Sequence, residues 1–275
     1  MKVGYQGVKG AFSEKAIDTY FGEGSCEKIG YSDFLTIFED VQSGALDYGM
    51  FPVENTTTGV IARTYDFIQN YDVFAVGEVV VPVRHCLIGI PGAKVEDVKT
   101  IYSHPEAILQ CNNFFKRNPE IKPVISEDTA LSVEYVKSEG KKHKAAIAGE
   151  QAAKTYGMEI IERNVQDSDA NMTRFLVVGG KEEYPDDADK VSIRMVTAHT
   201  PGSLYNALGI FASKNINVLK LESRPIPGKA FDYCFYLDFE GSLKDPDVIE
   251  ALRRLAYDCR QLDVFGNYKA SEHAI

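Results

Sequence analysis

The stretch FDYCFYLDFE, residues 231–240, places an apolar side chain at every second position. Strict alternation of this kind is typical of a β-strand with one buried face. The segments around it predict, in chain order, strand, helix, strand, then this strand, then helix and strand. Their apolar positions are Val191, Ile193 and Met195; Leu204, Leu208 and Phe211; Ile216, Val218, Leu219 and Leu221; Val248, Leu252 and Leu255; and Val264 and Tyr268. This βαββαβ order predicts a ferredoxin-like domain, with a four-stranded antiparallel sheet and two helices on one face.

The second face of such a sheet has no helices of its own and needs a packing partner. A second copy of the same domain would supply that partner most simply. We therefore expect a homo-oligomer, a dimer or larger, that assembles through residues 190–275.

An acidic segment precedes this domain. Residues 181–189, KEEYPDDAD, carry a proline and few apolar side chains, which is typical of a solvated linker. The net charge is −11 before residue 190 and +1 from residue 190 onward. The sequence therefore predicts one domain over residues 1–180, a linker over 181–189 and a second domain over 190–275.

Strand-like and helix-like segments alternate along residues 1–180, which predicts an α/β domain. The predicted strands are Lys2–Tyr5, Tyr48–Val53, Val73–Val83, Cys86–Gly89, Lys99–Tyr102, Ala145–Ala148 and Thr173–Val178. The predicted helices are Ser13–Phe21, Asp33–Gly44, Val60–Asn70, Pro105–Arg117, Thr129–Glu139 and Glu150–Tyr156. A first and a last strand in one sheet would make two lobes, with a ligand cleft between them.

Composition excludes several classes of protein. The net charge of −10 and the lack of a basic run argue against nucleic acid or an anionic membrane as a partner. No run of 18 apolar residues predicts a membrane span. The five cysteines are odd in number and form no Cys-x-x-Cys pair, which favours a reducing cytoplasm. The five histidines show no ligand spacing, so we expect neither a metal nor another cofactor.

Four loops carry groups that could bind or react. Residues 6–13, QGVKGAFS, join a strand to a helix and could approach an anion, although a plain turn explains them equally well. Residues 52–59, PVENTTTG, follow a strand; a helix cap explains a threonine there but leaves Asn55 unexplained.

The other two loops lie at the start of a predicted helix and at the start of a predicted strand. In Ser103-His104-Pro105, the proline fits the first helical position, and a cap is the more common role for His104. Residues 171–175, NMTRF, open a strand. A threonine there usually reflects β-propensity and an arginine is usually a surface charge, but an acidic protein that binds an anion needs a local cation.

These loops, in this order, resemble the prephenate dehydratases and the similar arogenate dehydratases over essentially the whole chain. The family's catalytic triplet is matched by Thr173-Arg174-Phe175, and two further motifs by Glu54-Asn55-Thr56 and by Ser103-His104-Pro105 with Gln110. Residues 190–275 resemble the ACT regulatory domain, with Gly202-Ser203-Leu204 and Glu222-Ser223-Arg224-Pro225 at its amino-acid-binding motifs.

The resemblance implies a two-lobed catalytic fold similar to type II periplasmic binding proteins, followed by an ACT domain. It implies conversion of prephenate to phenylpyruvate on the route to phenylalanine, without metal or other cofactor. Thr173 is then the proton donor to the leaving hydroxyl, Arg174 the carboxylate clamp and Phe175 a wall for the ring. Further substrate contacts are expected from Asn55, Thr56, Ser103, His104, Thr129 and Asn171.

The resemblance also implies that L-phenylalanine controls the enzyme from the interface between ACT domains. The expected effector residues are Gly202, Ser203, Leu204, Asn217, Leu219, Glu222, Ser223 and Arg224. Two alternatives remain: an arogenate dehydratase, and a non-catalytic amino-acid sensor. The Thr173 hydroxyl argues against the sensor, because binding a carboxylate does not require it.

Overall fold

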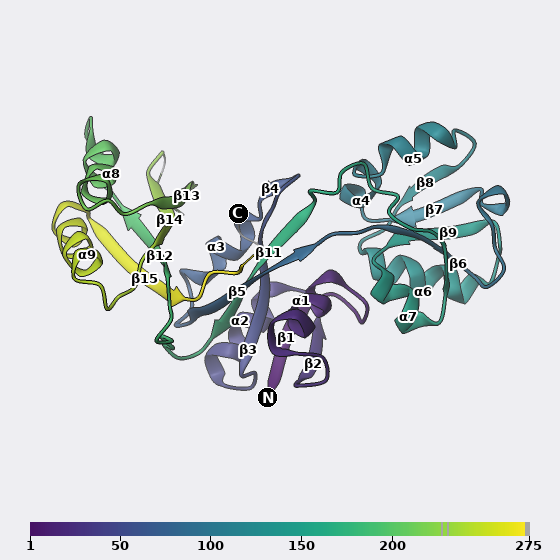
Figure 1. Ribbon diagram of the computed structural model, residues 1–275, viewed down its shortest axis with the longest axis horizontal. Helices are drawn as coiled ribbons and strands as arrows, with labels where there is room; N and C mark the ends of the chain where they lie inside the picture. Colours follow the sequence, from purple (N-terminus) through teal and green to yellow (C-terminus); the bar gives the residue numbers. More distant parts are fainter. Residues whose placement is uncertain (227, 230, 273–275) are drawn as a thin grey trace. The chain divides into compact units, whose positions relative to one another are not determined.

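A computed structural model describes residues 1–226, 228–229 and 231–272 (Figure 1). Helices and strands alternate through most of the chain, as the α/β prediction requires. The chain forms two compact units. The first contains Met1–Ile37, Met50–Ile61 and Val80–Phe175, and the second contains Phe38–Gly49, Ala62–Val79 and the residues from Leu176 onward. Each unit is described separately.

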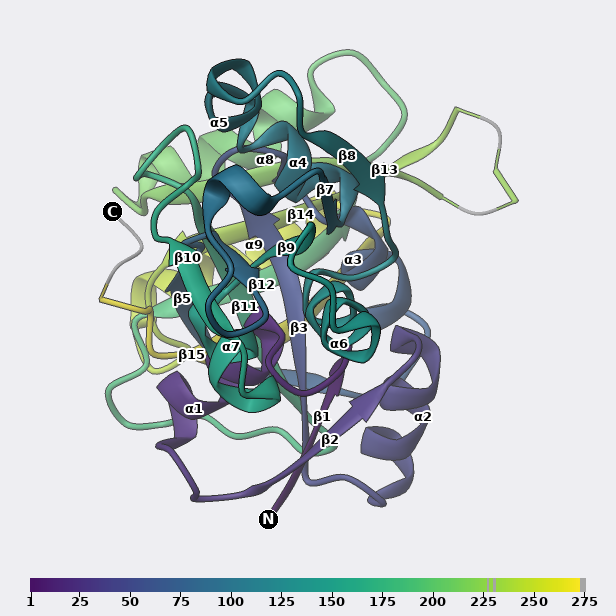
Figure 2. The same cartoon turned by 90° about the vertical axis from the view of Figure 1, so that its right-hand side faces the viewer.

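The first unit begins with a strand–helix–strand arrangement. Strand β1 (Lys2–Gln6) pairs in parallel with β2 (Glu27–Tyr31), and Figure 2 shows the two strands side by side. Helix α1 (Phe12–Phe21) connects them and buries Ala16 and Ile17. Gly10, before this helix, has φ +88°, and a Cβ there would lie 2.7 Å from the Cα of Ala152. Glycine is therefore required where the loop meets α7.

The first unit also contains a five-stranded sheet, in the order β10-β6-β9-β7-β8. Its strands are β6 (Cys86–Gly89), β7 (Thr100–Ser103), β8 (Lys122–Ile125), β9 (Lys144–Ala148) and β10 (Glu159–Glu162). Helices α4 (Pro105–Leu109) and α5 (Asn112–Arg117) lie over one face, and α6 (Thr129–Glu139) and α7 (Glu150–Tyr156) over the other (Figure 1). The two buried clusters, around Phe114 and around Val133, are the cores on these two faces.

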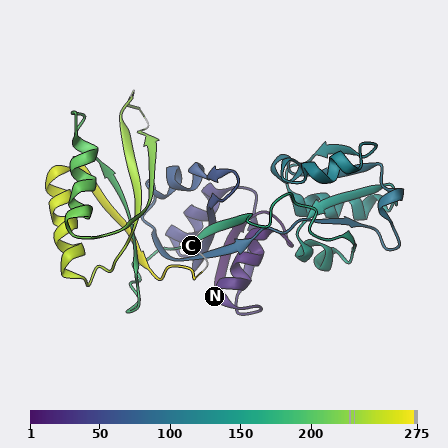
Figure 3. The same cartoon turned by 45° about the horizontal axis from the view of Figure 1, so that its top comes forward.

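The C-terminal part of the second unit confirms the predicted βαββαβ order. Its elements are β12 (Lys190–Val196), α8 (Ser203–Ser213), β13 (Val218–Pro225), β14 (Tyr233–Glu240), α9 (Pro246–Asp258) and β15 (Gln261–Tyr268). The strands pair antiparallel in the order β13-β14-β12-β15. Helices α8 and α9 lie on one side of this sheet (Figure 3), where Phe211, Leu237 and Leu255 belong to a common core. Phe231 lies before β14 and is exposed, so the alternating pattern runs two residues beyond the strand.

The other face of this sheet is polar, and residues from earlier in the chain cover part of it. The hydroxyl of Tyr236 donates to the carbonyl oxygen of Tyr65 in α3 (Ala62–Ile68) at 2.8 Å, and the two rings lie 5.0 Å apart. Lys190 forms an ion pair with Glu78 of β5 (Phe74–Pro82). Residues of the same chain therefore cover part of the sheet face that we had expected a second copy to cover. The homo-oligomer remains a prediction.

The remaining elements are α2 (Phe34–Ser43), β3 (Tyr48–Asn55), β4 (Gly59–Val60), β11 (Met172–Gly179) and the short 3-10 helix η1 (Val95–Asp97). All the predicted strands and helices of residues 1–180 are present, but their bounds differ. The expected helix over 105–117 is two helices, because both oxygens of the Asp167 carboxylate accept hydrogen bonds from Asn112 N and Asn113 N and cap a new helix start. Strands β2, β4, β8 and β10 were not predicted, and Val60, the expected start of a helix, lies in β4. Of the helices described, none is long and apolar enough to span a membrane.

Candidate active site

Two strand ends of the first unit meet at a set of buried polar side chains. Asn55 is the last residue of β3, Asn171 immediately precedes β11, and Thr173 is the second residue of β11. All three side chains are buried, with Thr173 exposed by only 8%. Buried polar groups must form hydrogen bonds to offset the loss of water, so the orientation of each group is constrained.

The amide of Asn55 is oriented by backbone groups. Its Oδ1 accepts from Thr57 N at 2.9 Å and from Thr58 N at 3.0 Å. Its Nδ2 lies 3.1 Å from the carbonyl oxygen of Met172, which can only accept. The carboxamide therefore cannot be reversed without losing three hydrogen bonds.

This orientation determines the role of the Thr173 hydroxyl. Asn55 Nδ2 lies 2.9 Å from Thr173 Oγ1 and 2.9 Å from Asn171 Oδ1. Because an amide nitrogen has no lone pair to offer, Thr173 Oγ1 must be the acceptor of this bond. The hydroxyl hydrogen of Thr173 is thus not used by Asn55 and is directed elsewhere.

The polar set extends to two residues that the predicted site did not contain. Gln110 Oε1 lies 2.7 Å from Asn171 Nδ2 and 2.9 Å from His85 Nε2. His85 is 2% exposed, and burial lowers the pKa of its imidazole, although the Gln110 contact opposes the shift. We call Asn55, Thr173, Asn171, Gln110 and His85 the amide network. Gln110 belongs to the Ser-His-Pro motif, but no local pattern indicated His85.

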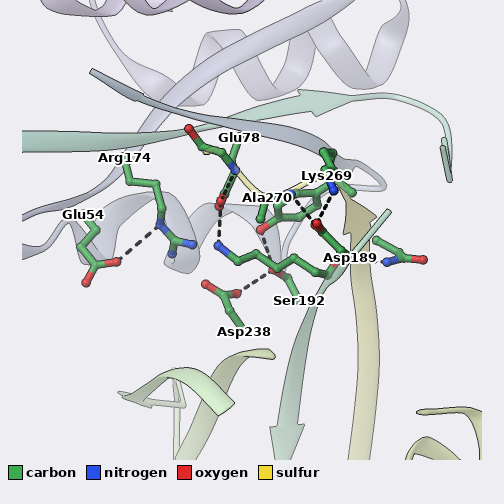
Figure 4. Close-up of polar contacts among 12 residues, drawn as sticks. Glu54, Glu78, Arg174, Asp189, Ser192, Asp238, Lys269 and Ala270 are labelled. Atoms are coloured by element: carbon green, nitrogen blue, oxygen red, sulfur yellow. Dashed lines mark hydrogen bonds and ion pairs between the residues drawn. The ribbon is translucent and has the colours of Figure 1, made fainter. Parts of the chain in front are cut away.

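Arg174 leaves β11 on the opposite side from Thr173, because successive side chains of a strand alternate. Its Nε lies 3.4 Å from Glu54 Oε2, and the side chain is 10% exposed (Figure 4). Glu54 and Asn55 alternate in the same way on β3, so the two strands carry an ion pair on one side and the amide network on the other. The clamp role of Arg174 stays a prediction.

The other predicted substrate residues have identifiable structural contacts. Thr56 Oγ1 donates to Ala170 O at 2.7 Å and accepts from Met172 N, which holds the turn before β11. Ser103 is fully buried, and its hydroxyl donates to Ile147 O at 2.6 Å. His104 caps α4, with its Nδ1 accepting from Glu106 N, which agrees with the cap interpretation.

Thr129 is the first residue of α6, where the neighbouring Asp128 supplies the cap. Phe175 is 2% exposed within β11. Neither residue has a contact here that identifies a substrate, and their roles remain predictions.

A cavity of about 860 Å³ lies elsewhere in the first unit. It is lined by the start of α1, the start of α7 and charged side chains that include Lys15, Arg84 and Arg163. None of the amide-network residues lines it. The loop of residues 6–13 therefore contributes to this cavity through Gly10, Ala11 and Phe12.

A second cavity, of about 600 Å³, lies in the second unit where β12 leads into α8. Gly202, Ser203 and Leu204 line it together with residues 196–201, Tyr205, Asp232, Tyr233, Phe235 and Arg260. The other predicted effector residues do not line it. Asn217 precedes β13, and Leu219, Glu222, Ser223 and Arg224 lie along that strand, with Leu219 exposed.

Arg224 is held by a neighbour in the same unit. Its guanidinium binds Asp66 through two hydrogen bonds, at 2.8 and 3.1 Å. This carboxylate raises the pKa of Arg224 above its usual range. No group of three or more metal-ligating side chains occurs among the residues that the structure covers.

An α/β unit with a buried polar network, followed by a βαββαβ domain with its own cavity, defines a class of enzymes that carry a small-molecule regulatory domain. Family models agree: the prephenate dehydratase model matches residues 3–183, and the ACT domain model matches residues 191–257. The chain belongs to the prephenate dehydratase family.

Individual proteins are similar over nearly the whole chain. Arogenate dehydratase/prephenate dehydratase 2 of Arabidopsis thaliana is 37% identical over 279 residues, which cover 98% of this chain and 72% of that protein. A prephenate dehydratase from Arthrobacter aurescens, solved in complex with L-Phe, superposes with a TM-score of 0.90 at 27% identity, over 98% of this chain and 90% of that one. The protein GqqA, described as a novel type of quorum-quenching acylase, has a TM-score of 0.91 at 30% identity and covers 99% of each chain.

Proposed function

We propose that this protein is a prephenate dehydratase that converts prephenate to phenylpyruvate in L-phenylalanine biosynthesis. The observation that carries the proposal is the Thr173 hydroxyl, whose oxygen accepts from Asn55 while its hydrogen is left for another acceptor. A hydroxyl oriented in this way can donate to the oxygen that leaves the substrate.

The reaction is redox-neutral. The bond between the ring and its carboxylate breaks, carbon dioxide leaves, and that electron pair enters the ring. The ring carbon–oxygen bond breaks, and the departing hydroxide takes up a proton and leaves as water. Formation of the aromatic ring drives the elimination, so the protein has to position a dianion and stabilise the leaving oxygen.

Three residues fill these roles in the proposal. Thr173 donates to the leaving hydroxyl, and Asn55 holds it in place. Arg174 binds a substrate carboxylate, since a guanidinium can contact two oxygens at once. Because its side chain leaves β11 on the side opposite to Thr173, this role requires the guanidinium to reach around the end of the strand, which begins at Met172. Glu54 lies beside Arg174, so substrate binding would share or replace an existing ion pair.

The proposed regulation places L-phenylalanine in the cavity around Gly202, Ser203 and Leu204. A complex with L-Phe is described for the Arthrobacter aurescens relative. We propose that two chains associate along β13, an edge strand on which Leu219 and Leu221 are exposed. Five free cysteines fit a cytoplasmic location.

The decisive experiment is turnover by the purified protein. Prephenate is supplied and phenylpyruvate is followed by its absorbance; arogenate is then supplied and phenylalanine is measured. Product from prephenate supports the proposal, and product from arogenate alone would identify an arogenate dehydratase. If neither substrate reacts while L-phenylalanine still binds in calorimetry, the chain is a sensor and the proposal is wrong.

A further inference from the structure

His85 is a buried histidine that the proposed reaction does not yet use. It lies between β5 and β6 and is 2% exposed. Its ring packs edge-on against Phe12, with centroids 5.7 Å apart, and its backbone N donates to Gln166 Oε1. Among the described residues, its side chain forms a hydrogen bond with Gln110, at 2.9 Å from Nε2.

The direction of that hydrogen bond follows from the backbone groups that orient Asn55, at the other end of the amide network. Asn55 is oriented by backbone groups, so its Nδ2 donates and Asn171 Oδ1 accepts. Asn171 Nδ2 must then donate to Gln110, which identifies the contacting atom of Gln110 as Oε1. An amide oxygen can only accept, so His85 has to donate from Nε2.

The surroundings of His85 favour a neutral ring with its hydrogen on Nε2. Nδ1 is buried and has no hydrogen-bond partner among the described residues, so a hydrogen there would be unsatisfied. The lowered pKa of the imidazole, caused by burial, agrees with a neutral ring. The lowered pKa favours a neutral ring, and the unpartnered Nδ1 favours the Nε2–H form that the network needs.

We propose that His85 is a positioning residue for the dehydration: its Nε2–H holds Gln110 Oε1 and, through Asn171, supports the Asn55 amide that the backbone orients towards Thr173 Oγ1. The inference rests on the proposed function. With Oε1 occupied by two donors, the Gln110 amide nitrogen is turned away from Asn171 and His85. Loss of the His85 donor would remove one of the two hydrogen bonds that hold Gln110 Oε1, which leaves the Gln110 side chain less restrained and weakens the order of the network towards Thr173.

The kinetic test compares two substitutions at one position. In His85→Gln the side-chain amide nitrogen lies near the position of Nε2 and can still donate, whereas His85→Leu cannot. We expect kcat with prephenate to fall about ten-fold in His85→Leu, the effect of one buried hydrogen bond, and to stay within about threefold in His85→Gln. KM should change less than kcat. A His85→Leu variant with normal kcat would overturn the proposal.

A stability control separates positioning from simple loss of packing. Val136 is fully buried in α6, in the cluster that contains Cys86 next to His85. Val136→Ala should lower the melting temperature while kcat stays normal. If Val136→Ala lowers kcat as much as His85→Leu does, His85 acts through stability alone and the proposal fails.

A double-mutant cycle tests whether His85 acts through Gln110. In a Gln110→Met background there is no amide oxygen to hold, so His85→Leu should change kcat by less than about twofold. A full ten-fold loss in that background would refute the assigned route. Nitrogen-15 NMR of the histidines at pH 7 provides a readout without turnover, and the expected state is neutral with hydrogen on Nε2.

The two proposals fail in different ways. Wild-type protein that turns over neither substrate would refute the proposed function, and the NMR result would still decide the direction of the His85 hydrogen bond. A hydrogen on Nδ1 alone would overturn the inference even in an active enzyme.

Discussion

Replacement of Lys190 or Glu78 should destabilise the protein more than any exposed charge substitution. Lys190 Nζ lies 2.7 Å from Glu78 Oε1, and the side chains are only 3% and 0% exposed (Figure 4 shows Glu78 in its surroundings). The same Glu78 oxygen also accepts from Ser271 N at 2.9 Å. The two side chains join β5 to the first strand of the regulatory domain, so the pair lies inside the second unit.

The magnitude follows from charge burial. With an effective dielectric constant of about 20, the attraction at this distance is about 6 kcal/mol, and it is offset by several kcal/mol of desolvation for each ion. The intact pair is therefore close to neutral for stability, whereas one partner alone remains buried without compensation. We expect Lys190→Met or Glu78→Gln to lower the free energy of unfolding by about 3–5 kcal/mol.

The assay is urea denaturation at pH 7 followed by circular dichroism. The double variant Lys190→Met/Glu78→Leu removes both charges and should recover most of the loss. Lys154→Met provides a matched control, because Lys154 pairs with Glu150 at 3.3 Å on an exposed helix surface, and we expect a change below about 1 kcal/mol. Single variants that match this control, or a double variant no better than the singles, would refute the reasoning.

Three further predictions concern the site and the pH dependence of stability. Thr173→Ala should lower kcat by about 10²–10⁴-fold while Thr173→Ser retains part of it, measured as phenylpyruvate formation; near-normal turnover of the alanine variant would exclude Thr173 as proton donor. Arg174→Lys should raise KM for prephenate because two-point binding is lost, and an unchanged KM would contradict the clamp. Lys144 lowers the pKa of Glu139 to about 2, so its contribution to stability is present above about pH 4.5 and is lost as the pH falls towards 2. Glu139→Gln lacks that contribution, so its free energy of unfolding should fall less than that of the wild type as the pH falls from about 4.5 to 2. An equal fall in the two proteins, measured by acid denaturation, would contradict the assignment.

Patterns of neighbouring residues were sufficient to predict much of the fold. The alternation in residues 231–240 and the spacing around it predicted the βαββαβ domain, because burial of one sheet face imposes a period of two. Strand β8 was missed because its side chains are exposed and carry no such pattern. The break between α4 and α5 depends on Asp167, more than fifty residues further along the chain, which no local pattern contains.

The candidate site likewise combines residues that local patterns indicated with residues whose contacts are distant in the sequence. Asn55 and Thr173 stood in recognisable loops, and the structure brings them within hydrogen-bond distance. A second copy was expected because one face of the regulatory sheet has no helices of its own, whereas Tyr65 and Glu78 of this chain cover part of that face. His85 was missed because its role depends on Gln110, which is 25 residues away, and on the two amides beyond Gln110, those of Asn171 and Asn55.

The order of Glu54 and Asn55 at the end of β3 makes the register of this strand unusually critical. A slip of one position would exchange the two side chains between the faces of the strand. The carboxylate would then face Asn171 Oδ1 with no hydrogen to donate to it, and the amide would face a guanidinium that has lost its counterion. A single deletion in β3 should therefore abolish both the ion pair and the hydroxyl orientation at once, even though every residue type would still be present in the chain.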